Sequence, residues 1–105
     1  MIETIIEPTL VVPVKLIGVL GSAAGSREIM LSGPRDQTVQ EVISALLKTV
    51  GSKFFRDLLV DAGTDDPRPN VIILLDDQDC NIFDGVKTKV EAGTRVTIIP
   101  VAHGG

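Results

Sequence analysis

The strongest pattern in the sequence is the helix signal of residues 38–51, and it limits the folds open to the chain. Thr38 stands three residues before Glu41, the spacing of a capping box at a helix N-terminus. Apolar residues then recur at helical spacing, and Gly51 is a natural helix stop. The apolar positions are Val39, Val42, Ile43, Leu46 and Val50. The rest of the chain must give this amphipathic helix a surface that buries its apolar face.

The segments before this helix resemble strands. Residues 9–20 are rich in β-branched residues and leucine, which favours a strand. Pro13 has no N–H, so we expect it near the strand's beginning or at an unpaired position. Residues 21–26 (GSAAGS) predict a loop and residues 27–32 a second strand, which together make a hairpin. Alternation in the first strand places Val14, Leu16 and Gly18 on one face, and Lys15, Ile17 and Val19 on the other.

The segments after the helix predict one more helix and a return to strands. Residues 53–60 predict a shorter helix, and residues 62–70, with two prolines and an acidic pair, predict a loop. Residues 71–76 (VIILLD) form a continuous apolar run, which favours a strand buried on both faces. Residues 76–83 are expected to turn and return as a short edge strand, and residues 84–93 to form turns.

Residues 94–101 (TRVTIIPV) predict the last strand. Val96 and Ile98 face one way, and Arg95, Thr97 and Ile99 the other. The chain between the first and last strands is long enough to cross over, so these two strands can pair in parallel at the centre of the sheet. We therefore expect an α+β fold in one domain, with the main helix packed across a mixed sheet of four or five strands. The predicted core includes Val14, Leu16, Val42, Ile43, Leu46, Val96 and Ile98.

Composition excludes several classes of function. The net charge of −4 and the three aromatic residues, all phenylalanine, argue against a nucleic-acid partner. One cysteine and one histidine cannot form a usual zinc site, so no metal site is expected. The chain has neither a signal peptide nor a membrane-length apolar run, so we expect no membrane association and a cytoplasmic location. Residues 18–25 are rich in glycine but lack the spacing of a phosphate-binding loop, and are read as a hairpin turn.

The terminal pair Gly104-Gly105 is the most informative feature for function. Two terminal glycines arise by chance in under about 1% of chains. Glycine lacks a Cβ, so an extended glycine terminus can enter a narrow site and leave its carbonyl open to attack. A frayed end or an artificial boundary would also produce this pair. Because residues 102–105 (AHGG) follow a strand and hold no large apolar side chain, we expect them to project as a flexible tail.

The C-terminal sequence resembles a known family of carriers. Residues 68–105 contain Phe83-Asp84-Gly85, the Ala92-Gly93 turn and Ile99-Pro100-Val101, and end in His103-Gly104-Gly105. This pattern is similar to that of the molybdopterin-synthase small subunit, the ubiquitin-related modifier and the small archaeal modifiers. These are ubiquitin-like sulfur carriers of the β-grasp class. The similarity covers roughly residues 12–105 and is specific only in the C-terminal third.

The resemblance implies that Gly105, with Gly104, is the chemically activated end of the chain. An adenylyltransferase resembling the ubiquitin-activating enzyme would join AMP to the Gly105 carboxylate, and a sulfur donor protein would then convert it to a thiocarboxylate. The sulfur would serve molybdopterin synthesis, through the synthase large subunit, or tRNA thiolation. ATP and magnesium would belong to the activating partner, so this chain would bind no cofactor and would not itself be an enzyme.

The resemblance also implies a docking patch for these partners. Ile17, Phe83 and Ile99 occupy positions that form an apolar patch on the outer face of the sheet in the family. The predicted patch consists of these three residues with Pro100 and Val101. Residues 1–11 lie outside the family pattern, and as an N-terminal extension of the domain at 1–101 they could instead cover the patch. Cys80 is read as structural and His103 as a tolerated tail residue.

Two other functions stay open at the level of sequence. A protein modifier would share the fold and the activation step, but would be joined through Gly105 to lysines of target proteins. A β-grasp interaction module would use no tail chemistry, and would tolerate replacement of both glycines.

Overall fold

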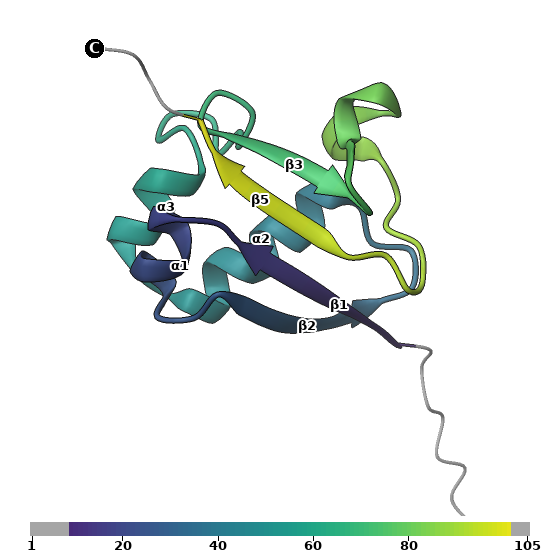
Figure 1. Ribbon diagram of the computed structural model, residues 1–105. Coiled ribbons are helices and arrows are strands. Elements are labelled where there is room, and N and C mark those ends of the chain that lie inside the picture. The colour runs from purple at the N-terminus through teal and green to yellow at the C-terminus, as the bar shows by residue number, and fades with distance from the viewer. Residues whose placement is uncertain (1–8, 102–105) are drawn as a thin grey trace, which may run out of the picture.

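The computed structural model describes residues 9–101 and shows a five-stranded sheet with helices packed on one face (Figure 1). Strand β1 (Thr9–Leu16) is followed by helix α1 (Val19–Ala24), strand β2 (Glu28–Pro34) and helices α2 (Val39–Val50) and α3 (Lys53–Leu59). The second half contains β3 (Val71–Leu75), β4 (Gln78–Asp79), the 3₁₀ helices η1 (Cys80–Ile82) and η2 (Gly85–Lys87), and β5 (Val96–Pro100).

The strand order is β2-β1-β5-β3-β4, so the first and last strands lie side by side at the centre. β1 and β5 are parallel, with Val14 opposite Val96 and Leu16 opposite Ile98. The other strand pairs are antiparallel, which makes the sheet mixed. This is the β-grasp arrangement, and the predictions of an α+β fold with parallel first and last strands are confirmed.

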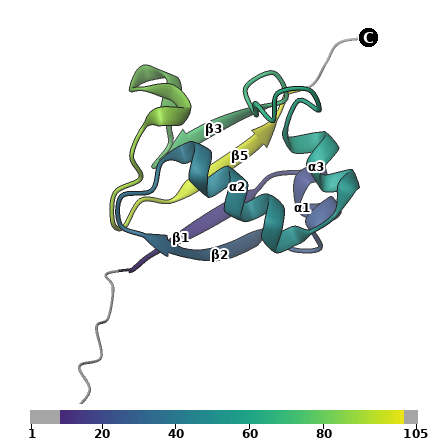
Figure 2. The same ribbon diagram turned by 180° about the vertical axis from the view of Figure 1, so that it is seen from behind.

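Helix α2 crosses one face of the sheet, which we call the inner face (Figure 2). The predicted capping box is present: Glu41 N donates to Thr38 Oγ1, and Thr38 N donates to Glu41 Oε1 at 2.9 Å. Gly51 ends the helix with a φ of 66°, in the left-handed region that glycine adopts without strain. The seven predicted core residues are all buried, and they pack together between α2 and the inner face: Val14, Leu16, Val42, Ile43, Leu46, Val96 and Ile98.

The region expected to be a simple hairpin loop contains a short helix instead. β1 ends at Leu16, four residues earlier than predicted, because Gly18 has a φ of 59° and turns the chain out of the strand. Residues 19–24 then form α1, whose Leu20 is fully buried. Burial of Leu20 offsets the weak helix propensity of a segment that contains Gly21 and Ser22. β1 and β2 still pair as an antiparallel hairpin, from Thr9 opposite Pro34 to Lys15 opposite Glu28.

Pro13 and the start of β1 differ from the expectation. Pro13 lies in the middle of β1 rather than near its beginning. It stands opposite Met30 of β2, just before the segment that pairs with β5 begins at Val14. Strand β1 begins at Thr9 with Leu10 buried, so residues 9–11 are part of the sheet. The rest of the segment expected to be an extension, residues 1–8, lies outside the described residues.

Strand β3 is buried on one face only, so the prediction of burial on both faces is wrong. Val71, Ile73 and Leu75 are buried, whereas Ile72 is 40% exposed and Leu74 is half-buried. The helices cover only the inner face, and no described element covers the opposite face, which we call the outer face (Figures 1 and 2). A continuous apolar run therefore leaves apolar side chains on the outer surface of the molecule.

Candidate functional site

The outer face carries a group of apolar side chains where β5 ends. Ile99 on β5 lies opposite Ile72 on β3, and paired residues of antiparallel strands share a face. Both side chains therefore point away from α2, and Ile72 is 40% exposed. The inner-face neighbours of the same two strands, Ile73 and Ile98, are buried. The strand alternation thus divides the apolar residues of β3 and β5 between a core and a surface.

The turn from β1 to α1 adds two side chains to this group. Ile17 N donates to the carbonyl of Ile98 at 3.1 Å, which holds Ile17 beside the end of β5. The turn at Gly18 then brings the chain close to Pro100: a Cβ on Gly18 would lie 3.9 Å from Pro100 Cγ. Val19 follows and is 45% exposed.

Pro100 and Val101 complete the group where residues 102–105 continue the chain. Val101 N donates to the carbonyl of Asn70 at 3.0 Å, which fixes the end of the described chain to the loop before β3. Beside it lies a hollow between α1, α3 and the end of β5, lined by Val19, Asp57, Leu58, Asn70, Pro100 and Val101.

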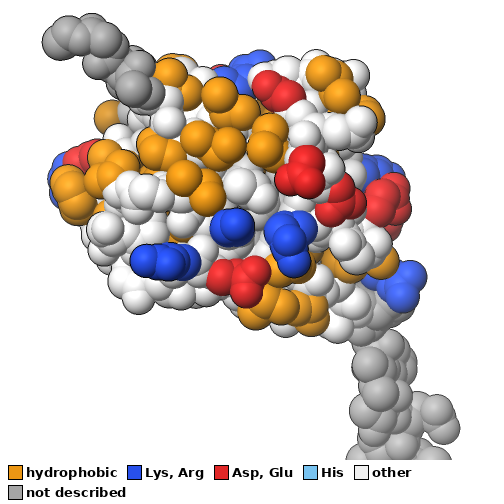
Figure 3. Space-filling model, in the orientation of Figure 1, with side chains coloured by type: hydrophobic (Ala, Val, Ile, Leu, Met, Phe, Trp, Pro, Cys, Tyr) orange, Lys and Arg blue, Asp and Glu red, His pale blue; other side chains and the backbone are white. Residues whose placement is uncertain are grey.

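We call this group the tail-side surface, and it consists of Ile17, Val19, Ile72, Ile99, Pro100 and Val101. Figure 3 shows apolar side chains gathered over β3 and β5 next to the point where the last residues begin, with charged side chains further down the same face. The surface contains four of the five residues of the predicted patch: Ile17, Ile99, Pro100 and Val101. Gly104, Gly105 and the predicted flexible tail lie outside the described residues.

Phe83, the fifth residue of the predicted patch, lies elsewhere. It follows η1 and lines a pocket with Leu75 and Thr94, near the Val96 end of β5 rather than the Pro100 end. The placement of Phe83 on the outer face with Ile17 and Ile99 is therefore corrected. The cause is η1, which takes the chain off the sheet after the two residues of β4. Phe83 is 53% exposed, so it is not a core residue either.

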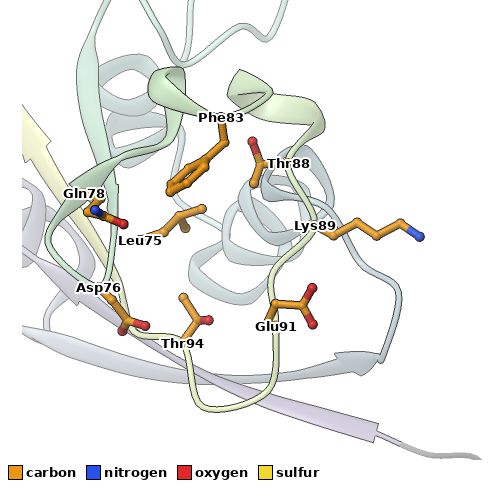
Figure 4. A pocket seen from close by; sticks show the side chains of 8 residues that line it. All are labelled: Leu75, Asp76, Gln78, Phe83, Thr88, Lys89, Glu91 and Thr94. Carbon is orange, nitrogen blue, oxygen red and sulfur yellow. The ribbon is translucent and has the colours of Figure 1, made fainter.

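The pocket that contains Phe83 has walls from three segments (Figure 4). The end of β3 and β4 supply Leu75, Asp76 and Gln78, and the segment before β5 supplies Thr88, Lys89, Glu91 and Thr94. The Phe83 ring points down over Leu75 in this view, while the Lys89 side chain extends away from the pocket. We call this the Phe83 pocket.

The titratable groups with shifted pKa values line neither the tail-side surface nor the Phe83 pocket. The hydrogen bonds from Arg68 hold the pKa of the Asp66 carboxyl below its usual value, in the loop that precedes β3. Burial raises the pKa of the Cys80 thiol, and the charge of Asp79 raises it further. A buried thiol with a raised pKa is a poor nucleophile, which supports the structural reading of Cys80.

Sequence reasoning missed Ile72 and Val19 as members of the tail-side surface. Ile72 was assigned to a buried strand because a continuous apolar run does not reveal which faces are covered. Val19 was placed on the outer side of a longer first strand, but it reaches the surface from α1.

Within residues 9–101, no group of three or more histidine, cysteine or acidic side chains is arranged to hold a metal ion. No helix in that part of the chain is long and apolar enough to cross a membrane.

Comparisons with known proteins point in one direction. A family model described as Urm1 (Ubiquitin related modifier) matches residues 15–105. No curated protein sequence matches significantly. The small archaeal modifier protein 1 (SAMP1) of Methanosarcina acetivorans has a similar structure, with a TM-score of 0.78 and 23% identity, over 93% of this chain and 99% of that one.

Two other solved structures extend the similarity. Urm1 from Trypanosoma brucei has a TM-score of 0.71 and 25% identity, over 95% of this chain and 100% of that one. CysO from Mycobacterium tuberculosis, described as an antigen, has a TM-score of 0.69 and 26% identity, over 87% of this chain and 99% of that one.

Proposed function

The chain belongs to the Urm1 (ubiquitin related modifier) family, and we propose that it is a sulfur carrier activated at the Gly105 carboxylate. The family groups small ubiquitin-like carrier and modifier proteins. Beyond membership of the family, the proposal names Gly105 as the reacting residue and places activation by ATP before sulfur transfer. The observation that carries it is the position of the tail-side surface: the family match runs through Gly104 and Gly105, and the described chain ends at Val101 beside exposed apolar side chains.

The proposed activation takes place in the site of a partner. The Gly105 carboxylate attacks the α-phosphate of ATP, pyrophosphate leaves, and an acyl-adenylate forms. Hydrosulfide (HS⁻) supplied by a sulfur donor protein then attacks the acyl carbon, the bond to AMP breaks, and the thiocarboxylate remains without any change of oxidation state. ATP and its magnesium ion are bound by the activating adenylyltransferase, and this chain supplies only the reacting terminus. The final sulfur acceptor would be a molybdopterin precursor or a tRNA base.

The tail-side surface would provide the affinity for that partner. Ile72, Val19 and Ile99 lie in the same surface as Val101, where the described chain ends, so a partner that covers them would also lie close to the start of the last four residues. Burial of apolar area contributes roughly 25 cal/mol per Å². The charged side chains further down the outer face would then lie at the polar rim of the contact (Figure 3).

A second candidate function is attachment to other proteins. The matched family and the SAMP1 structure are both described as modifiers, and the same acyl-adenylate can react with a lysine amine to form an isopeptide bond. The two functions share activation and differ in the nucleophile that displaces AMP.

The test is ATP–pyrophosphate exchange with the cognate activating enzyme, followed by intact mass measurement. We expect the chain that ends at Gly105 to support exchange and, with a sulfur donor, to gain the mass of one sulfur-for-oxygen exchange. Deletion of Gly105, or Gly104→Leu, should abolish exchange, because a side chain at 104 would obstruct a narrow channel and the shortened chain would not reach the α-phosphate.

A thermal melt of each variant is the control, and its midpoint should not change. Normal exchange by the shortened chain would refute the proposal and leave the interaction module as the better reading. Exchange without sulfur loading, but with transfer to lysines, would assign the chain to the modifiers alone.

A further inference from the structure

The Phe83 pocket is a feature of the described chain that the proposed function does not use. Phe83 exposes 53% of its surface although it lies away from the tail-side surface. Its ring stands over Leu75, so the pocket has an apolar floor (Figure 4). The cavity has a volume of about 290 Å³, at the lower limit for small-molecule sites. It is of a size to take one side chain.

The walls of the pocket are held in place by hydrogen bonds. Asp84 N donates to Thr88 Oγ1 at 2.9 Å, which closes the segment around η2. Val39 N, at the start of α2, donates to the carbonyl of Thr88 at 2.9 Å. Arg95 N donates to Asp76 Oδ1 at 2.9 Å and ties the end of β3 to the start of β5. The pocket is therefore largely formed before a ligand arrives, which lowers the entropic cost of binding.

The charges around the pocket favour a cation. Asp76 and Glu91 line it, and Lys89, the basic residue among the lining side chains, extends away from it (Figure 4). Asp76 accepts a hydrogen bond from the backbone N–H of Arg95, and neither Asp76 nor Glu91 makes an ion pair with another residue of the described range 9–101. An exposed aromatic ring also attracts a positive charge placed over its face.

We propose that the Phe83 pocket receives a lysine or arginine side chain of a partner protein. The aliphatic stem would lie on Leu75 and Phe83. The charged end would lie between the carboxylates of Asp76 and Glu91, which stand on opposite sides of Thr94 (Figure 4). Long basic side chains bury their stems on apolar surface while the charge stays near water and acidic groups, which matches this floor and rim. The site does not depend on the activation of Gly105, and it lies away from the tail-side surface, so both could be occupied at once.

The test uses model side chains and backbone amide NMR of the whole chain. The probes are the N-acetyl methylamides of lysine, arginine and norleucine, titrated at low salt to about 50 mM, the range of weak single-residue binding. We expect saturable shifts at the amides of Leu75, Gln78, Thr88 and Thr94 with the two cations, and at least about threefold weaker binding of neutral norleucine.

Two variants and two matched controls locate the site. Phe83→Ala and Glu91→Gln should each weaken binding of the cations at least about threefold. Phe54→Ala removes a ring on α3 that is somewhat more exposed than Phe83, and Glu28→Gln removes an exposed carboxylate on β2. Neither should change binding.

Three outcomes would overturn the proposal. Equal binding of norleucine would make the pocket a general apolar site, and no saturable shift would mean that it binds no basic side chain. Cation binding that neither Phe83→Ala nor Glu91→Gln weakens would place the bound cation elsewhere.

Discussion

The inner and outer faces of the sheet are built from the same strands, but the apolar side chains of the outer face are more exposed than those of the inner face. On β5, Ile98 is fully buried under the helices, while its neighbour Ile99 faces outward. On β3, Ile73 is buried and Ile72 is 40% exposed. The burial of the inner residues is accounted for by folding. The outer residues stay only partly buried after folding, and a group of partly exposed apolar side chains is typical of a contact surface for another molecule.

The largest effect that this comparison predicts is the loss of a side chain on the inner side. Leu46 on α2 is fully buried against the sheet. Leu46→Ala should lower the free energy of unfolding by about 2–5 kcal/mol, because it removes buried methyl groups and leaves a cavity. The measurement is chemical denaturation. A loss below about 1 kcal/mol would mean that the inner face is not the stabilising one.

A charge on the outer side should act on binding, with a smaller effect on folding than Leu46→Ala. Ile72→Asp would place a carboxylate in the desolvated centre of the proposed contact, and should weaken the complex with the activating enzyme at least about tenfold. The free energy of unfolding should fall by about 1–2 kcal/mol, less than for Leu46→Ala, because Ile72 is 40% exposed and loses only part of its apolar burial. Calorimetry of the complex and a denaturation curve measure the two quantities.

Phe83→Asp is the matched control, since it adds the same charge at an exposed apolar residue away from the tail-side surface. It should change the affinity for the activating enzyme less than about twofold. If Phe83→Asp weakens that complex as much as Ile72→Asp does, the activating partner spans both regions and the tail-side surface is too narrowly defined.

A smaller effect is expected where the helix that covers the inner face begins. Thr38→Ala removes the acceptor for Glu41 N and should cost about 1 kcal/mol of stability, without removing any apolar contact of the core. Ser44→Ala, in the exposed middle of the same helix, should cost nothing, because alanine is the better helix former. Equal losses in the two variants would show that the cap contributes nothing specific.

The smallest effect lies in the loop before β3, outside both faces. Arg68→Ala removes the hydrogen bonds that lower the pKa of Asp66, so this pKa should rise toward the ordinary aspartate value of about 3.9. Because the folded-state pKa is lowered, the pair's contribution to stability is present above the unfolded-state pKa and is lost as the pH falls through the folded-state pKa. Carboxyl NMR during a pH titration measures the shift, and an unchanged pKa of Asp66 would contradict the assignment.

The sequence predicted those elements whose signals are local. The start of α2 is set by Thr38 and Glu41 and its end by Gly51, so its bounds followed from the residues themselves. Alternation in residues 94–101 correctly separated Ile98 from Ile99. Of the candidate site, the resemblance supplied Ile17, Ile99, Pro100 and Val101, which the structure brings together.

The failures came from features that depend on distant contacts. Helix α1 is stabilised by the burial of Leu20 in the core, and no local pattern in GSAAGS predicts a helix. The exposure of Ile72 depends on which face the helices cover, and the apolar run of β3 is the same in either case. Phe83 was misplaced because η1 redirects the chain after only two residues of β4.

The central position of β5 has a consequence for the order in which the molecule is made. β5 is the last strand of the described chain, yet it is the one that joins the β1–β2 hairpin to β3 and β4. Until residues 96–100 have left the ribosome, the nascent polypeptide can hold two separate fragments of sheet but no closed domain. Such long-range pairing also makes folding slow compared with local structure. Chains terminated before β5 would therefore lack both a finished domain and a complete tail-side surface, so an activating enzyme that binds this surface would not recognise them.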